Sequence, residues 1–382
     1  MGSKNNILDE QFDSGTPVPT NKFVLDRNDF SSEDEMDRYF KEHKEAPREA
    51  YDYYIKSTSQ QEIDKFQKVT FTRATGKEIF TLNNLPSNNV VQSCYIGTSY
   101  LYATQQINNP AGAYQLISRF PLNGSNNIYR KDYMRLNRSG HSQTLQWFTN
   151  SSGISYFWIV TKATLVDNST TAKYDWGTQV GRLQYQAGTT IDYTDIARIS
   201  SINRANKIGQ SFGTLKRCEA ALDSSRKYLL IWSMSTSDKA QFAYYKTNEI
   251  NAILDRKESS TSKYISAGDD SITHACITSY EVPTFYTKVM YQSIQGIEFN
   301  DTQHIYISSG PSNKQPVIQK GIWGTHKFIN NAVYISGGVM SNPAKYETET
   351  EGIQLKGDSV YLNISTHNPT SKYIYSIPKN NF

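Results

Sequence analysis

Five Gln or Glu residues, each opening a similar short segment, are the side chains in this sequence best placed to bind something. These anchor residues are Gln92, Gln143, Glu219, Gln295 and Glu351. If their segments met around one axis, amides and carboxylates in a ring could hold a cation, water or sugar hydroxyls. Two carboxylates are too few for a hard-cation cage of about six to eight oxygens. The alternative is that the ring bonds neighbouring backbone and closes a channel, because buried polar groups need partners.

His141 lies in SGHSQT, two residues before an anchor, and is the histidine best placed to join the ring; a satisfied loop histidine is the alternative. No HExxH motif or His/Cys cluster indicates zinc, so neither a metal nor a cofactor is expected. GxSxG, GxxxxGK[ST] and GxGxxG motifs are absent, and no catalytic residue is predicted. A glycosidase needs two carboxylates, and Glu219 with Glu351 keeps a glycan hydrolase open.

Each anchor begins one copy of a β-unit in which a short strand, a polar turn and a second strand follow one another. The copies read QSCYIGTSYLYA, QTLQWFTNSSGISYFWIV, EAALDSSRKYLLIW, QGIEFNDTQHIYIS and EGIQLKGDSVYLNIS. A third strand follows in every copy, and the turns carry Gly, Asn and Asp, which suit hairpins. Units of three or four strands cannot bury both faces alone, so neighbouring units must stack.

The repeats therefore predict an all-β protein in which residues 66–382 form a five-bladed β-propeller; a β-sandwich or a two-domain all-β protein is the alternative. The fifth copy reaches the end of the sequence at Phe382 before a fourth strand. We expect the strand FQKVTFT, residues 66–72, to complete it and close the ring, which removes the open edge. No helix longer than two turns is predicted after Phe66.

The first 65 residues differ from the rest in charge. They hold 9 Lys and Arg against 15 Asp and Glu, whereas the remainder holds 31 against 21. Residues 1–65 are predicted to be an acidic arm that is partly disordered and partly helical, with helices over 33–44 and from Pro47. The arm is either an inhibitory or docking element or a solvated extension.

The basic remainder is expected to attract anionic polymers. Trp147, Trp176 and Trp323 are predicted to lie on loops and stack on sugar rings, with core packing as the alternative. No basic run interleaved with aromatics suggests nucleic-acid binding. No apolar stretch is long enough for a membrane span, and the first residues lack the apolar region of a Sec signal peptide. The three cysteines form no CxxC pair and are expected to be buried thiols.

The repeat segments also carry a family resemblance. GHSQTLQWF (140–148), SINRANKIG (201–209), KRCEAALDSSRKYLLI (216–231), SIQGIEFNDTQHIYISS (293–309) and ETEGIQL (349–355) resemble the helveticin J family, the large bacteriocins of lactobacilli. The resemblance covers about residues 66–382 and leaves out the acidic arm.

The resemblance implies a secreted protein, exported without a visible Sec signal, that acts against related Gram-positive bacteria. Its implied partner is a cell-surface glycan or teichoic acid, bound through a basic, aromatic-rich surface of the propeller. The resemblance carries over no catalytic residue, which favours a binding protein over an enzyme. A glycan hydrolase of propeller type and a carbohydrate-binding lectin that does not kill remain the alternatives.

Overall fold

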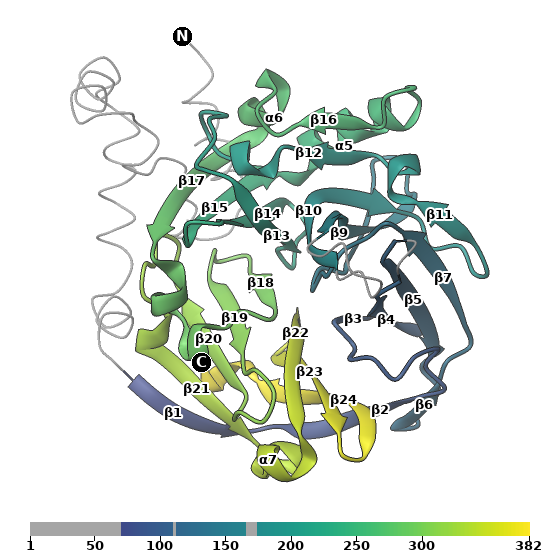
Figure 1. Ribbon diagram of the computed structural model, residues 1–382, viewed down its shortest axis with the longest axis vertical. Helices are drawn as coiled ribbons and strands as arrows, with labels where there is room; N and C mark the ends of the chain where they lie inside the picture. Colours follow the sequence, from purple (N-terminus) through teal and green to yellow (C-terminus); the bar gives the residue numbers. More distant parts are fainter. Residues whose placement is uncertain (1–69, 110–111, 166–173) are drawn as a thin grey trace.

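Each β-unit of the sequence folds as one sheet, and the five sheets are arranged radially with their first strands nearest the middle (Figure 1). The computed structural model describes residues 70–109, 112–165 and 174–382. The five-bladed β-propeller predicted from the repeats is therefore confirmed. The acidic arm predicted for residues 1–65 lies outside the described residues.

The first two sheets are each five-stranded. From the middle outwards, the first consists of β3 (Ser93–Ile96), β4 (Tyr100–Ile107), β5 (Tyr114–Pro121), β7 (Asp132–Asn137) and β11 (Thr190–Asp192). The second consists of β8 (Gln146–Thr149), β9 (Ser155–Leu165), β10 (Tyr174–Leu183), β12 (Arg198–Ser200) and β16 (Tyr264–Ser266).

The remaining three sheets follow the same order. The third consists of β13 (Leu215–Leu222), β14 (Tyr228–Ser235), β15 (Lys239–Lys246) and β17 (Cys276–Pro283). The fourth consists of β18 (Ile297–Phe299), β19 (Ile305–Ser309), β20 (Val317–Gly321), β21 (Asn331–Ser336) and β1 (Thr70–Thr75). The fifth consists of β22 (Thr348–Lys356), β23 (Ser359–His367), β24 (Thr370–Pro378), β2 (Lys77–Asn83) and β6 (Asn127–Tyr129).

The N-terminal strands close the ring, but not as the sequence predicted. The strand that completes the fifth sheet is β2, which pairs antiparallel with β24, and not residues 66–72. Thr70, Phe71 and Thr72 belong instead to β1, which pairs parallel with β21 on the fourth sheet. In the first three copies, β6, β11 and β16 likewise precede a fourth strand and pair parallel with the preceding sheet. β1 and β2 are thus the missing outer half of the fifth unit.

Aromatic side chains fill the space between sheets. Between the third and fourth sheets, Trp232, Phe242, Phe285, Phe299 and Phe328 are all buried in one cluster. Phe242 stacks on Tyr280 with ring centroids 4.9 Å apart and an interplanar angle of 6°. The three cysteines are buried, as expected, and none of them forms a disulfide.

A twelve-residue helix, α5 (Thr247–Glu258), corrects the prediction that no helix exceeds two turns. Its buried Ile250, Ile253 and Leu254 follow helical spacing, but most of the residues around them are polar, so the pattern is weak in the sequence. Arg182 of β10 is buried and pairs with α5 through Asp255 at 2.5 Å and Glu258 at 3.1 Å. The shorter α6 (Asp270–Ala275) and α7 (Pro343–Tyr346) also lie in connections between strands.

Candidate functional site

The five anchor residues meet in the middle of the propeller, with Gln143 at the centre of their hydrogen bonds. The Gln143 side-chain amide donates to Gln92 Oε1 at 3.4 Å, to Gln295 Oε1 at 3.2 Å and to Glu351 Oε2 at 3.0 Å. Its backbone N–H donates to Glu219 Oε2 at 3.0 Å. Because each residue comes from a different unit, this polar ring ties the five innermost segments together.

The ionisable side chains at the ring, those of Arg217, Glu219 and Glu351, are buried. Arg217 donates to Gln143 Oε1 at 2.9 Å and pairs with Glu219 at 3.1 Å. Burial raises the pKa of Glu351 well above its ordinary value, against the opposing effects of the Gln143 hydrogen bond and of Arg217. Burial also raises the pKa of Glu219, against the opposing effect of Arg217.

The ring closes the channel at its own level. Glu219 and Glu351 are 0% and 1% exposed. The Thr144 hydroxyl also donates to Glu219, at 2.7 Å, and the Gln143 side-chain amide donates to Glu351. The two carboxylates considered for glycan hydrolysis therefore offer no open face to a sugar. Binding by the anchors themselves stays a prediction.

His141 and Trp176 lie together on one side of the ring, at the level of residues that precede the anchors. Their ring centroids are 4.1 Å apart, and the Arg217 guanidinium carbon lies 3.3 Å from the Trp176 ring centroid. Burial and the nearby Arg217 lower the pKa of His141 to about 3, which keeps the imidazole neutral. The guanidinium covers one face of Trp176, so at most the other face is available for a sugar.

On the other side of the ring lies a pocket of about 260 Å³, which we call the channel-mouth pocket. All five sheets contribute to its lining through their first strands or the turns that follow. The lining residues are Tyr95, Gln146, Trp147, Leu222, Asp223, Ser224, Arg226, Glu298, Gln354, Leu355, Lys356 and Gly357. Five of these come three positions after an anchor: Tyr95, Gln146, Leu222, Glu298 and Gln354.

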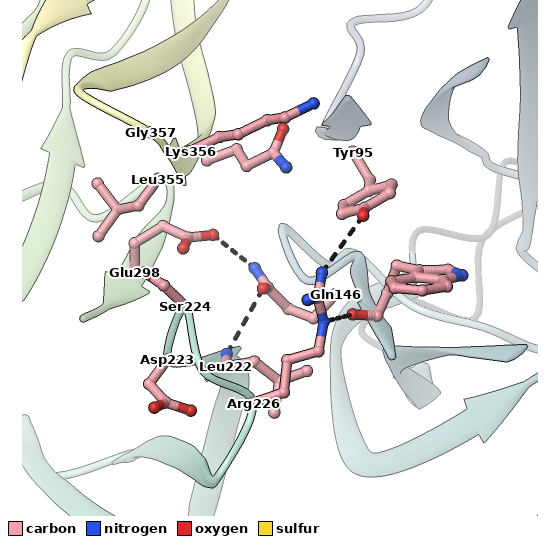
Figure 2. Close-up of a pocket in the computed structure, with 12 residues that line it drawn as sticks. Tyr95, Gln146, Leu222, Asp223, Ser224, Arg226, Glu298, Leu355, Lys356 and Gly357 are labelled. Carbon is pink, nitrogen blue, oxygen red and sulfur yellow. Dashed lines mark hydrogen bonds between the residues drawn. The ribbon is translucent and has the colours of Figure 1, made fainter. Parts of the chain in front are cut away.

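Glu298 is a buried acid at this pocket. Figure 2 shows Glu298 and Arg226 approaching from opposite sides of the view, with Gln146 between them. Gln146 Nε2 donates to Glu298 Oε1, and Gln146 Oε1 accepts from the Leu222 N–H at 3.5 Å. Burial raises the pKa of Glu298 to about 8, so the carboxyl is largely protonated at pH 7 and can donate a hydrogen bond.

Two basic side chains line the same pocket. Arg226 donates to the Trp147 carbonyl at 2.7 Å and to the Tyr95 hydroxyl at 3.3 Å, as Figure 2 shows. Lys356 Nζ donates to the carbonyl oxygens of Ile96 at 3.0 Å and Gly97 at 2.8 Å. A guanidinium has five N–H donors and an ammonium three, so these contacts leave donors over on both side chains.

The three tryptophans predicted to stack on sugars have different positions. Trp147 is half-buried at the channel-mouth pocket, with its ring 6.1 Å from that of Tyr95 and 4.7 Å from the Arg226 guanidinium carbon. Trp323, by contrast, is only 7% exposed and packs edge-on against Tyr244 and Tyr280. Trp323 lies in the connection after β20, as predicted, but the apolar space between the third and fourth sheets takes up its ring, so it is not placed to stack on a sugar. Trp147 and Trp176 lie in β8 and β10, which corrects their predicted position on loops.

A second surface feature lies along the outer part of the first sheet. Its members, which we call the basic face, are Arg130, Lys131, Arg135 and Arg138, with exposed Tyr129 and Tyr133. Arg130 lies 5.1 Å from the Tyr133 ring, and Arg135 lies 3.6 Å from the Tyr114 ring. Asp192 pairs with Arg138, but no described acidic residue pairs with Arg130, Lys131 or Arg135.

Sequence reasoning found the ring and Trp147 but missed most of the pocket. Glu298, Arg226 and Lys356 belong to no recognisable motif, and Asp223 is of a type typical of hairpin turns. The signal was present for Glu298, which repeats at the same offset from its anchor as Gln146 and Gln354. Arg226 lies in the turn after β13 and Lys356 at the last position of β22, so they do not share an offset from their anchors.

The arrangement defines a class of protein: a five-bladed β-propeller whose channel is closed by a polar ring and opens beyond it into a small polar pocket. The sequence carries the identity further. The family model described as bacteriocin helveticin-J matches residues 65–380, so this chain belongs to the helveticin-J family.

One bacteriocin relative agrees with this assignment. Bacteriocin helveticin-J of Lactobacillus helveticus is 24% identical over 306 residues, which cover 73% of this chain and 86% of that protein. Among solved structures, the tail fibre of Staphylococcus aureus phage P68 matches with 15% identity and a TM-score of 0.47, over 80% of this chain and 53% of the fibre. An α-L-arabinofuranosidase of Podospora anserina matches with 9% identity and a TM-score of 0.39, over 81% of this chain and 98% of the enzyme. At these values the structural similarities say nothing of function.

Two further observations concern only the described parts of the chain. None of their helices combines the length and the apolar character that crossing a membrane requires. Among the same residues, no group of three or more His, Cys, Asp or Glu side chains is arranged to hold a metal ion.

Proposed function

We propose that this chain is a secreted antibacterial protein of the helveticin-J type that binds the envelope of related Gram-positive bacteria. Membership of the bacteriocin family supports the antibacterial activity. The basic face supports the binding step, because the field of several cations on one surface attracts polyanions such as teichoic acids.

The basic face is the observation that carries the binding proposal. Arg130, Lys131 and Arg135 lie within six residues of one another, on and beside β7, and form no ion pair with a described acid. Asp132, the one acid within this run, pairs with Arg119. Tyr129 is 57% exposed and Tyr133 is 40% exposed beside them. Aromatic rings with polar tips suit contact with sugars. The surface thus combines attraction for anionic polymer with stacking area for glycan.

The proposal is tested on whole cells of lactobacilli at low ionic strength, where surface charge is least screened. We expect the triple variant Arg130→Glu, Lys131→Glu, Arg135→Glu to bind the cells at least tenfold more weakly and to inhibit growth correspondingly less. The matched control is Lys314→Glu, Lys327→Glu, Lys345→Glu, which changes net charge equally at exposed positions on the fourth and fifth units. Equal weakening in both variants, or none in either, would contradict the proposal.

The same assays separate the alternatives. A protein that binds cells and never slows their growth would be a lectin without killing activity. Release of soluble sugar from isolated walls, together with falling turbidity, would indicate a glycan hydrolase. For that case the ring pair is tested by the double variant Glu219→Gln, Glu351→Gln, and its burial predicts that hydrolysis would not depend on it.

A further inference from the structure

The channel-mouth pocket is separate from the basic face and has its own chemistry. Its volume of about 260 Å³ lies just below the usual range for pockets that enclose drug-sized ligands, which fits one small sugar or polyol unit. Its lining alternates amides, a carboxyl and a hydroxyl with the rings of Tyr95 and Trp147. Such a lining suits a ligand with several hydroxyl groups and some C–H surface.

The charge of the pocket at neutral pH is positive. Arg226 and Lys356 bring two cations with donors to spare beyond their bonds to Trp147, Tyr95 and the Ile96–Gly97 carbonyls. Asp223 is buried, and its carboxylate accepts from the Tyr228 N–H at 2.8 Å and from the Ser225 hydroxyl. Its oxygens are thus engaged by the turn. A neutral ligand would leave the spare cationic donors without a charged partner.

We propose that the channel-mouth pocket binds one unit of a polyol that carries a single anionic group, either a carboxylate or a phosphate. Arg226 and Lys356 would hold the anionic group, since charge-assisted hydrogen bonds are the strong ones. Gln354 and Gln146 would meet the hydroxyls, because each side-chain amide keeps one N–H and one lone pair beyond its bonds within the protein. Glu298 is 2% exposed and would act through its hydrogen bond with Gln146. The inference deepens the proposed envelope binding and rests on it for the setting in which such a unit is met.

Glu298 gives the proposal a pH signature. Its pKa of about 8 means that raising the pH from 7 to 9 adds a negative charge beside the bound anion, and affinity should fall. The charged and titratable groups around the pocket come from all the elements packed there. They are Tyr95 and Cys94 on β3, Asp223 and Arg226 on the turn after β13, Asp301 on the turn after β18, Lys356 on β22 and Lys379 beyond β24. Burial raises the pKa of Asp223 only to about 6, below this window.

Lys356 acts in the same direction as Glu298. Burial lowers its pKa, so its loss of a proton at high pH would also weaken anion binding. A Glu298→Gln variant separates Glu298 from Lys356 and the other titrating neighbours, because the amide keeps hydrogen bonding and removes the titration. Any pH dependence that remains in this variant comes from those neighbours.

The test is calorimetric titration of the full chain, with saturation-transfer NMR for weak binders. N-Acetylmuramic acid represents the carboxylate source and sn-glycerol 3-phosphate the phosphate source, and N-acetylglucosamine and glycerol are their neutral counterparts. We expect at least one acid to bind tenfold or more tightly than its neutral counterpart. Arg226→Met and Lys356→Met should each weaken that binding about tenfold or more, and the exposed control Lys314→Met should leave it unchanged.

The pH series follows with whichever acid binds. Both ligands are ionised across pH 7 to 9, since the carboxyl titrates far below and the second phosphate pKa is about 6. Affinity should fall about tenfold between pH 7 and pH 9 in the parent chain through the linkage to Glu298, and clearly less in Glu298→Gln. This readout does not depend on variants of Arg226 or Lys356 folding correctly.

Three results would overturn the inference: no binding of either acid, equal binding of acid and neutral counterpart, or Arg226→Met and Lys356→Met variants that bind as well as Lys314→Met. These outcomes are distinct from failure of the proposed function. If cells still capture the protein through the basic face, only the pocket assignment falls. If the acids bind but cells do not capture the protein, the envelope proposal falls and the pocket assignment stands.

Discussion

At the scale of single residues, Gln143 is the polar contact point of the propeller. Its side-chain amide nitrogen donates to Gln92, Gln295 and Glu351, and its side-chain oxygen accepts from Arg217. Its backbone N–H donates to Glu219. An amide suits this place because it donates and accepts at once without adding charge. Gln143 thus bonds to the anchors of all four other units, while Arg217 Nε beside it has no hydrogen-bond partner among the described residues.

Replacing Gln143 by Ala should destabilise the fold by about 1–3 kcal/mol, because the Glu351 and Arg217 groups lose a buried partner. The measurement is urea unfolding followed by circular dichroism. Gln186→Ala, at an exposed position on the second unit, is the control and should stay within about 0.5 kcal/mol of the parent. If the two variants unfold at the same urea concentration, the ring contributes no net hydrogen-bond stability.

At the scale of elements, the inner strands approach one another because small residues follow the anchors. The position after each anchor holds Ser93, Thr144, Ala220, Gly296 or Gly352. A Cβ built on Gly296 would lie 2.6 Å from the Ile353 nitrogen and 2.8 Å from Gly352 Cα. Both are backbone atoms, which cannot move aside without displacing a strand.

Gly296→Ala should therefore destabilise the propeller by about 1–3 kcal/mol, as overpacking of a tight core does. Ser93→Ala is the matched control, because it keeps a small side chain at the equivalent position of the first unit. Thermal unfolding by circular dichroism compares the two. A Gly296→Ala melting temperature equal to that of Ser93→Ala would mean that the fourth and fifth inner strands have room to spare.

The elements also show what sequence could and could not predict. The anchors, hairpin turns and third strands repeat in order, and this was enough for the five sheets. The closing strand was placed at residues 66–72 because β1 and β2 are both alternating strands, separated only by Gly76, and sequence does not show which sheet edge each will meet. Trp323 was misjudged because a residue after a strand can point inward or outward, and only packing against Tyr244 and Tyr280 decides.

The pocket was missed for a different reason. Repeat analysis identifies positions that share a residue type, and the anchors share Gln or Glu. The next layer carries Tyr95, Gln146, Leu222, Glu298 and Gln354, which share a position but not a chemistry. Because the five units contribute different residue types to the pocket, a search for repeated residue types does not detect it.

At the scale of the whole molecule, closure of the ring depends on two strands from the start of the described chain. β2 supplies the fourth strand of the fifth sheet, where Leu82 is 5% exposed, and β1 covers the outer edge of the fourth sheet, where Ala74 is also 5% exposed. The register between β2 and β24 runs from Lys77 opposite Ser376 to Thr81 opposite Tyr373. The two ends of the propeller sequence are therefore joined by hydrogen bonds across the last sheet.

A chain that begins at Phe66 should keep the fold of the full chain, because all five sheets lie within residues 70–382. A chain that begins at Asn84 lacks β1 and β2, exposes the edge of β24 and should aggregate or melt roughly 10 °C or more below the longer form. Size-exclusion chromatography and thermal circular dichroism measure both. If the form beginning at Asn84 elutes and melts like the form beginning at Phe66, closure by the N-terminal strands adds nothing to stability.

The form beginning at Phe66 also tests whether residues 1–65 restrain the activity. Its inhibition of lactobacilli is compared with that of the full chain. Stronger inhibition by the shorter form would indicate an inhibitory arm, and equal inhibition would indicate an extension without that role.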